Sequence, residues 1–129
     1  MDILVLGGTR FVGRHIVEAL LDGGHRVSVL TRGKSPDELP ASVERLQGDR
    51  EQGTVGLAAL GSREWDACVD VSGYTPKQVR PSAESLRDRV GRYVFVSTVS
   101  VYVESGDVPV VETHPLLPEA AEHVTFSRP

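Results

Sequence analysis

Residues 2–30 read DILVLGGTRFVGRHIVEALLDGGHRVSVL, and this stretch decides the fold. The aliphatic run 3–6 shows no alternation with polar residues, which indicates a strand buried on both faces, as in a parallel sheet. Apolar residues then recur at helical spacing over 11–21, and the glycine pair 23–24 ends that helix. A second aliphatic strand follows at 26–30. Strand, glycine turn, helix and strand within about 30 residues form one βαβ unit, whose crossover should be right-handed.

The alternation of strands and helices continues toward the C-terminus. Further strands are expected at 43–46, 67–71 and 93–96, helices at 55–60 and 76–90 with Gly91 closing the second, and a short strand at 108–111. This pattern predicts an α/β fold, a doubly wound (Rossmann) parallel sheet of order 3-2-1-4-5 with its ligand at the switch point between strands one and four. We expect residues 1–103 to form this dinucleotide-binding domain. Residues 104–129 are expected to be a loop-rich tail, with disorder as the alternative.

Length and composition limit the classes of function. A chain of 129 residues with 40% hydrophobic and 25% charged residues fits one soluble globular domain. The net charge of −4 and the lack of a basic cluster argue against a nucleic-acid partner. The single cysteine, Cys68, fits a reducing cytoplasm, and no histidine pair has metal-site spacing. No apolar run approaches the roughly 20 residues of a membrane span, so we predict a cytoplasmic protein without membrane or metal partners.

The run GGTRFVG at 7–13 lies between a strand and a helix, the context in which a glycine motif indicates phosphate binding. The first glycine permits the tight turn, the second leaves room for the ligand, and Gly13 lets the helix pack closely on the sheet. The amides of Phe11, Val12 and Gly13 would then donate to a pyrophosphate, helped by the helix dipole. A plain turn in a non-binding α/β protein is the alternative. The predicted contacts are Gly7, Gly8, Thr9, Arg10, Phe11, Val12 and Gly13.

The spacing of these glycines resembles the Gly-x-x-Gly-x-x-Gly turn of the extended short-chain dehydrogenase/reductases, the NAD(P)-dependent sugar epimerase/dehydratase family. Arg10 stands at the middle glycine. That form is similar to a subgroup with bacterial epimerases or reductases and chloroplast stem-loop-binding proteins. The resemblance covers nearly the whole chain as the N-terminal part of the family fold, ending before its sixth strand and substrate domain. Arg10 either places a cation beside the cofactor phosphates or is solvated.

The residues after the second strand bear on which dinucleotide is bound. An acid there would accept from the ribose 2′-OH of NAD, whereas an arginine suits the 2′-phosphate of NADP. The sequence reads LTRGK at 30–34, without an acid, so Arg32 with Lys34 or Arg10 favours NADP, and NAD is the alternative. The other interpretation is that Arg32 and Lys34 are ordinary loop cations.

The family resemblance implies further cofactor contacts. Asp49, in Gly48-Asp49-Arg50, matches the acid placed by the adenine amino group, and Arg50 is included with it. Ser72 and Gly73 match a pair of small residues that line the cofactor. Tyr74 either covers the ribose or packs on its own loop.

The segment 96–102, VSTVSVY, resembles the family's Ser-Ser/Thr-x-x-Val-Tyr, which makes Thr98 the matching catalytic hydroxyl. It would hydrogen-bond the substrate oxygen whose charge changes during hydride transfer. None of the three tyrosines has a lysine four residues later, so the family's Tyr-x-x-x-Lys acid/base is missing.

We therefore expect the cofactor-binding portion of an NAD(P)-dependent epimerase/dehydratase- or reductase-like oxidoreductase, incomplete for catalysis. In the full-length protein the substrate would be a nucleotide sugar or another small carbonyl or alcohol. The alternative is a non-catalytic NADP(H)-binding or RNA-binding module. Homo-oligomerisation is doubtful for this chain, because half of the family's dimer face would be absent.

Overall fold

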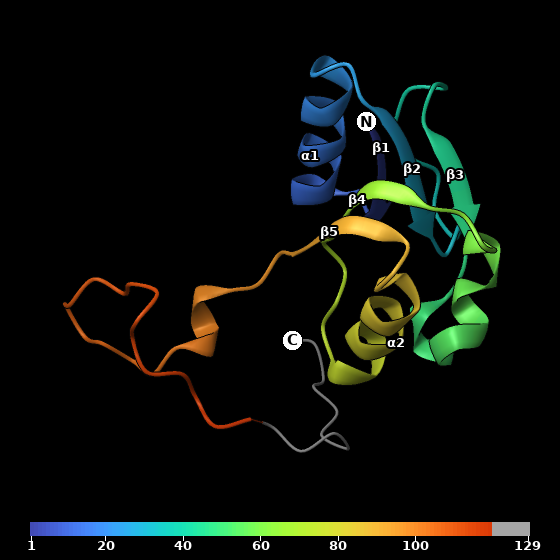
Figure 1. The fold of residues 1–129 in the computed structure, drawn as a ribbon. Coiled ribbons are helices and arrows are strands. Elements are labelled where there is room, and N and C mark those ends of the chain that lie inside the picture. The colour runs from blue at the N-terminus through green and yellow to red at the C-terminus, as the bar shows by residue number, and fades with distance from the viewer. Residues whose placement is uncertain (120–129) are drawn as a thin grey trace. The chain divides into compact units, whose positions relative to one another are not determined.

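One parallel sheet in the order β3-β2-β1-β4-β5 forms the centre of the computed structural model, which describes residues 1–119 (Figure 1). The strands are β1 (Asp2–Leu6), β2 (Arg26–Thr31), β3 (Glu44–Gln47), β4 (Trp65–Asp70) and β5 (Val90–Phe95). The α-helices are α1 (Phe11–Asp22) and α2 (Pro76–Leu86), and the 3₁₀ helices are η1 (Arg50–Leu60) and η2 (Val99–Val101). This order confirms the predicted doubly wound sheet.

β1 is the central strand, and its register explains why its sequence is aliphatic throughout. Ile3 lies opposite Val27 of β2 and Ala67 of β4, so both edges of the strand are paired. Successive side chains of a strand point to opposite faces. The four residues 3–6 therefore supply two separate cores and are all buried.

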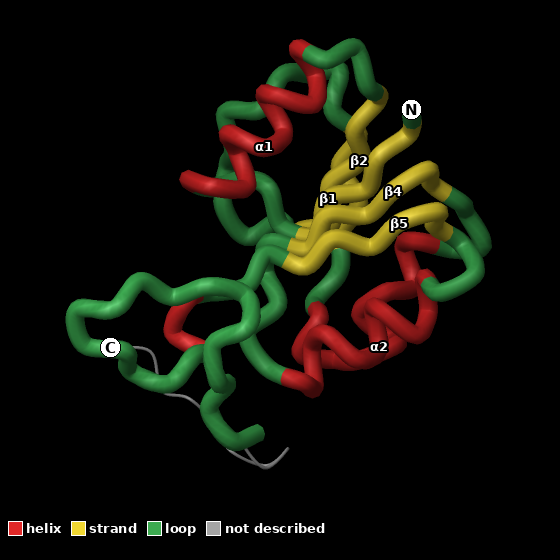
Figure 2. The backbone as a smooth tube through the Cα atoms, turned by 60° about the vertical axis from the view of Figure 1, so that its left-hand side comes forward, coloured by secondary structure: helices red, strands yellow, loops and turns green. Residues whose placement is uncertain are grey.

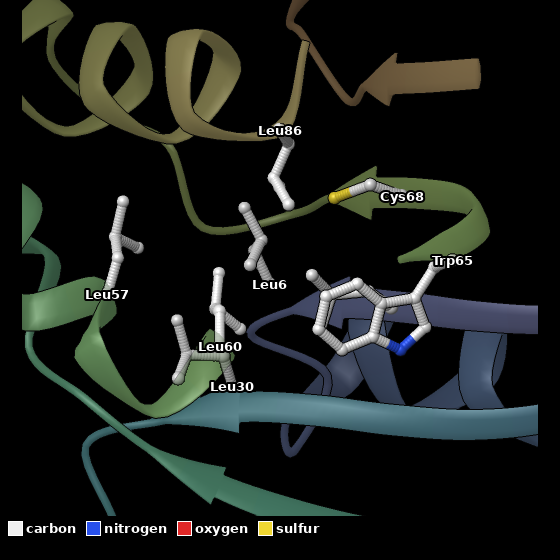
Figure 3. Packing of buried hydrophobic residues seen from close by; sticks show 8 residues of the cluster. Leu6, Leu30, Leu57, Leu60, Trp65, Cys68 and Leu86 are labelled. Atoms are coloured by element: carbon white, nitrogen blue, oxygen red, sulfur yellow. The ribbon is translucent and has the colours of Figure 1, made fainter. Parts of the chain in front are cut away.

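The two faces of the sheet are covered by different helices, as Figure 2 shows for α1 and α2. On the α1 face the buried cluster consists of Ile3, Val5, Val17, Val27, Val29, Leu39 and Val43. On the opposite face, against η1 and α2, it consists of Leu4, Leu6, Leu30, Leu57, Leu60, Trp65, Cys68 and Leu86 (Figure 3). The carboxyl ends of β1 and β4 thus lie between two packed layers.

Some predicted elements differ from the observed ones. The helix expected at 55–60 is a 3₁₀ helix that begins at Arg50 and is kinked at Gly53, where φ is +59°. Gly91 lies inside β5 and does not end α2. Glycine is needed at this position because the backbone passes so close to β4 that a Cβ would lie 2.9 Å from the Asp66 carbonyl oxygen. The prediction of a strand at 108–111 is wrong, because the amide of Val108 donates to the carbonyl oxygen of Ser105 in a turn.

The chain divides into two compact units between Val96 and Ser97, earlier than the predicted boundary after residue 103. In the second unit Tyr102 forms an antiparallel bridge with Leu116, and the flanking amides donate across the same pair of segments. Residues 97–103 are therefore tied to the segment that follows them. The last part of the predicted tail, 120–129, lies outside the described residues.

Candidate functional site

The predicted phosphate turn lies at the carboxyl end of β1, where the sheet order reverses between β1 and β4. Gly7 and Gly8 have φ values of +100° and +99°, a backbone conformation that side chains rarely adopt. The amide of Gly7 donates to the carbonyl oxygen of Leu30 at 2.9 Å. The turn therefore keeps its hydrogen bond to the end of β2 before the chain leaves the sheet for α1.

Close packing, as well as backbone conformation, requires glycine in this turn. A Cβ on Gly7 would lie 2.9 Å from Val71 Cγ2, and one on Gly13 would lie 2.7 Å from the Cα of Gly8. The close packing predicted for Gly13 is thus confirmed. A Cβ on Gly8 would be crowded by three core side chains, Val17, Val5 and Val29. The structure thus gives Gly8 a packing role toward the core, and the room for a ligand at this residue stays a prediction.

The start of α1 presents backbone amides that precede the helical hydrogen bonds. Arg14 N donates to Arg10 O at 3.2 Å, so the amides of Phe11, Val12 and Gly13 come before this bond. The Arg10 side chain does not cap the helix. Phe11 has a φ of +34° and is 79% exposed, Val12 is also exposed, and Gly13 is buried. These donors sit at the positive end of the helix dipole and suit an anion.

Arg10 connects the glycine turn to the loop that follows β2. Its Nη2 donates to Ser35 Oγ at 3.3 Å. The same loop contains Arg32 and Lys34, both exposed. Arg32 is held through its backbone, since its carbonyl oxygen accepts from Gln47 Nε2 at 3.1 Å. Both interpretations of Arg10, a cation beside the cofactor phosphates or a solvated side chain, stay predictions.

The two carboxylates of the same loop are each paired with an arginine. Asp37 receives two bonds from Arg45, at 3.0 and 2.6 Å, and this hydrogen bonding lowers the pKa of Asp37. Glu38 forms an ion pair with Arg14 of α1. Their negative charge is therefore largely balanced within the loop's own surroundings.

Arg50, a predicted cofactor contact, is buried and directed into the protein. Its five N–H groups donate to Ser82 Oγ, both oxygens of Asp70, Ser72 Oγ and the Gln78 carbonyl oxygen. A guanidinium has five N–H donors, so none is left for a phosphate in this structure. The structure therefore gives Arg50 an internal role in place of the predicted cofactor contact.

Asp70 is the acceptor at the centre of this buried network, and sequence reasoning missed it. It is 0% exposed and accepts from the Tyr93 hydroxyl at 2.7 Å in addition to Arg50. Burial, then the hydrogen bond to this carboxylate, raises the pKa of Tyr93. The available signal was an acid directly after the apolar run 67–69 of β4, because buried carboxylates are almost always paired.

The loop after β4 lies against the glycine turn. Ser72 Oγ donates to the Leu6 carbonyl oxygen at 3.0 Å, directly before Gly7. Gly73 has no room for a side chain, since a Cβ there would lie 2.5 Å from Val79 Cγ2. Tyr74 is 64% exposed. This loop therefore flanks the turn at the switch point.

The remaining predicted residues cap short helices. Asp49 Oδ1 accepts from the amide of Glu51 at 3.1 Å and begins η1. Thr98 lies in the second unit, where its Oγ1 accepts from the amide of Ser100 at 3.2 Å and begins η2. Their predicted roles toward adenine and substrate stay predictions.

Other features of residues 1–119 add no second site. No group of three or more His, Cys, Asp or Glu side chains in this part of the chain is arranged to hold a metal ion. His15 lies exposed on α1. None of the helices described is long and apolar enough to cross a membrane.

Comparison with known proteins gives consistent matches over nearly the whole chain. The NAD dependent epimerase/dehydratase family matches residues 3–123. The chloroplast stem-loop binding protein of 41 kDa b of Arabidopsis thaliana is 30% identical over 131 residues, which cover 92% of this chain and 34% of that protein. The chain thus spans about a third of this relative's length.

Two solved structures show the same fold. A UDP-galactose 4-epimerase superposes with a TM-score of 0.78 at 23% identity, covering 92% of this chain and 45% of that one. The dTDP-glucose 4,6-dehydratase of Bacillus anthracis, solved in complex with NAD, gives a TM-score of 0.72 at 19% identity, covering 93% and 45%.

Proposed function

Because the chain belongs to the NAD dependent epimerase/dehydratase family, we propose that it forms the cofactor-binding part of an epimerase/dehydratase- or reductase-like oxidoreductase. The observation that carries the proposal is the glycine turn at the carboxyl end of β1. Three backbone amides there, those of the exposed Phe11 and Val12 and of the buried Gly13, precede the first bond of α1. The residues present fit a dinucleotide, because the glycine turn leads directly into the amide donors at the start of α1, which suit the negative charge of a pyrophosphate.

The amides of Phe11, Val12 and Gly13 would hold the pyrophosphate at the positive end of the helix dipole. Asp49 would accept from the adenine amino group with its second carboxylate oxygen, since Oδ1 is engaged by Glu51. Gly73 and the exposed Tyr74 would line the ribose. When bound, the nicotinamide would take up a hydride from the substrate and return it.

We further propose that the chain prefers NADP to NAD. Arg10 donates to Ser35 in the loop after β2, and that loop also contains the exposed cations Arg32 and Lys34. The loop's own carboxylates, Asp37 and Glu38, are bound by other arginines and add little repulsion. A 2′-phosphate is therefore accommodated here better than a neutral ribose hydroxyl.

The proposed catalytic contribution of this chain is the hydroxyl of Thr98. It would donate to the substrate oxygen, as Ser or Thr does at this position of the family motif. Because no tyrosine here has a lysine four residues later, we propose that the 129-residue chain alone does not turn over a nucleotide sugar. A single-turnover hydride-transfer assay with UDP-galactose would refute this if it showed robust activity.

Titration of the chain with NADPH and NADH, followed by thermal unfolding, tests cofactor binding directly. A ligand at 100 times its Kd stabilises the folded state by about 2.7 kcal/mol, which raises Tm by several degrees. We expect a larger shift with NADPH than with NADH at equal concentration. No shift with either dinucleotide at millimolar concentration would contradict the proposal.

A further inference from the structure

A continuous set of hydrogen bonds leads from η1 to the glycine turn. Arg50 Nη1 donates to Asp70 Oδ1 at 2.7 Å and to Ser72 Oγ at 3.0 Å. Ser72 Oγ in turn donates to the Leu6 carbonyl oxygen at 3.0 Å. Leu6 is the last residue of β1 and directly precedes Gly7. The Arg50 guanidinium is thus linked by two hydrogen bonds, through Ser72, to Leu6 directly before the glycine turn.

The loop after β4 also packs on the turn itself. The amide of Val71 donates to the same Leu6 carbonyl oxygen at 3.1 Å. A Cβ on Gly7 would lie 3.0 Å from Ser72 Cβ, and one on Gly13 would lie 3.0 Å from Val71 Cγ2. A displacement of Val71 or Ser72 would therefore be transmitted to both ends of the glycine turn.

The ion pair at the centre of this arrangement is buried. Asp70 is 0% exposed, and Arg50, 8% exposed, binds it through both terminal nitrogens at 2.7 Å. Buried ion pairs are weak sources of stability, because desolvation offsets their attraction. What the planar guanidinium adds is direction, since its five donors are fixed relative to one another. Once Asp70 orients the group, the remaining Nη1 donor is aimed at Ser72.

From this geometry we propose that Arg50 is a positioning residue for the dinucleotide site, which holds the glycine turn through Ser72. The inference deepens the proposed function and rests on it, because the affinity affected is that for the dinucleotide. Arg50 itself touches no cofactor in this account. Loss of its bond to Ser72 would leave the fold in place and loosen the turn that presents the pyrophosphate-binding amides.

The test uses a double variant, Arg50→Met with Asp70→Asn, in the 129-residue chain. Removing both charges avoids an unpaired buried carboxylate, and the asparagine oxygen still accepts from Tyr93. The matched control is Ser82→Ala, which removes a different hydrogen bond of Arg50, the one from Nε to the Ser82 hydroxyl in α2. Arg50→Lys serves as a second variant that keeps the charge beside Asp70 and loses the fixed fork of donors.

Two measurements are made on each variant. NADPH affinity, measured by titration well below the unfolding temperature, should fall roughly tenfold in the double variant and in Arg50→Lys, and stay near wild type in Ser82→Ala. Amide hydrogen exchange without ligand should accelerate at Gly7 and Val71 in the same two variants, and not in the control. A general loss of stability would accelerate exchange throughout the chain, whereas loosening of the turn accelerates it at these residues.

The outcomes separate this inference from the proposed function. If the wild-type chain binds NADPH and the folded double variant binds it equally well, with unchanged exchange at Gly7, the positioning role is overturned. If the wild-type chain binds no dinucleotide, the proposed function fails. The exchange rates at the turn then still decide whether Arg50 holds it.

Discussion

Gly13 and Gly8 are in backbone contact, so that a Cβ on Gly13 would fall 2.7 Å from the Cα and 2.9 Å from the nitrogen of Gly8. Real Cβ atoms do not approach backbone atoms so closely. The first turn of α1 is therefore seated directly on the glycine turn, and the amides at its start are held in a fixed direction. Any side chain at residue 13 must push the helix away from the end of β1.

We expect Gly13→Ala to lower the free energy of unfolding by about 1–3 kcal/mol, as overpacking does, and to abolish detectable NADPH binding. The matched control is Gly23→Ala at the other end of α1. Gly23 has an ordinary φ of −75°, and a Cβ there would meet His25 ring atoms at 3.3 Å. Denaturant unfolding and NADPH titration check both variants. Unaltered binding in Gly13→Ala would show that the amides are not presented by this contact.

The strand order could be predicted because the sequence marks each element with local chemistry. The run 3–6 is aliphatic on both faces, which a central parallel strand requires, and glycines separate it from α1 and α1 from β2. The prediction that Gly91 ends α2 is wrong, because a glycine that makes room for a neighbouring backbone looks the same in the sequence as one that ends a helix. The pattern of residues alone does not tell which neighbour comes close.

The turn was predictable for the same reason, but the contacts between distant residues were not. Arg50 directly follows Asp49, so the sequence predicts both residues at the cofactor. The Arg50 side chain instead turns inward to Asp70, twenty residues later, because η1 begins at that point and brings it beneath the end of β4. Nothing in the spacing of these two residues predicts the pair. The bond from Arg10 to Ser35 is likewise a product of tertiary structure.

We expect Arg10→Ala to weaken NADPH binding roughly tenfold more than NADH binding, because a charge-assisted hydrogen bond to the 2′-phosphate is lost in one case alone. Parallel titrations of the two dinucleotides check the ratio of affinities. Arg87→Ala, which removes an exposed arginine at the end of α2, is the control and should change neither. Equal weakening of both dinucleotides would assign Arg10 to the shared pyrophosphate and refute its role in discrimination.

Cys68 should resist thiol reagents while the chain is folded. It is 0% exposed, and burial, followed by the negative charge of Asp70, raises its pKa to about 12. An unfolded thiol ionises near pH 8.5. Reaction with an aromatic disulfide at pH 8 should thus be limited by unfolding and become rapid in denaturant. Rapid labelling in native buffer would contradict the burial.

Because the pKa of Cys68 is raised in the folded chain, we expect the free energy of unfolding to depend on pH in the alkaline range. The folded state keeps the Cys68 proton up to about pH 12, whereas the unfolded state releases it above about pH 8.5. The folded state therefore binds more protons in this range, and the free energy of unfolding falls as pH rises. Cys68→Ala should flatten that fall, and Tyr93, whose pKa is also raised, should account for part of the remainder. An unchanged slope would show that Cys68 does not titrate in this way.

The core beneath η1 should be sensitive to the loss of a single side chain. Leu60 is 0% exposed and packs in the cluster with Trp65, the one tryptophan of the chain, which is 4% exposed (Figure 3). Leu60→Ala would leave a cavity that the surrounding sheet and helices fill incompletely, so we expect a loss of about 2–5 kcal/mol. Trp65 fluorescence during urea unfolding reports this loss directly, since the indole becomes exposed when the cluster opens.

Val55→Ala provides the matched control for that experiment, because Val55 lies in the same 3₁₀ helix and is 72% exposed. Its removal deletes apolar atoms from the helix without opening a cavity, and we expect a change within about 0.5 kcal/mol. Comparable losses in the two variants would mean that the propensity of η1 decides stability, and would contradict a core formed between η1 and the sheet. A large loss confined to Leu60→Ala would establish that this short helix is held by what it buries.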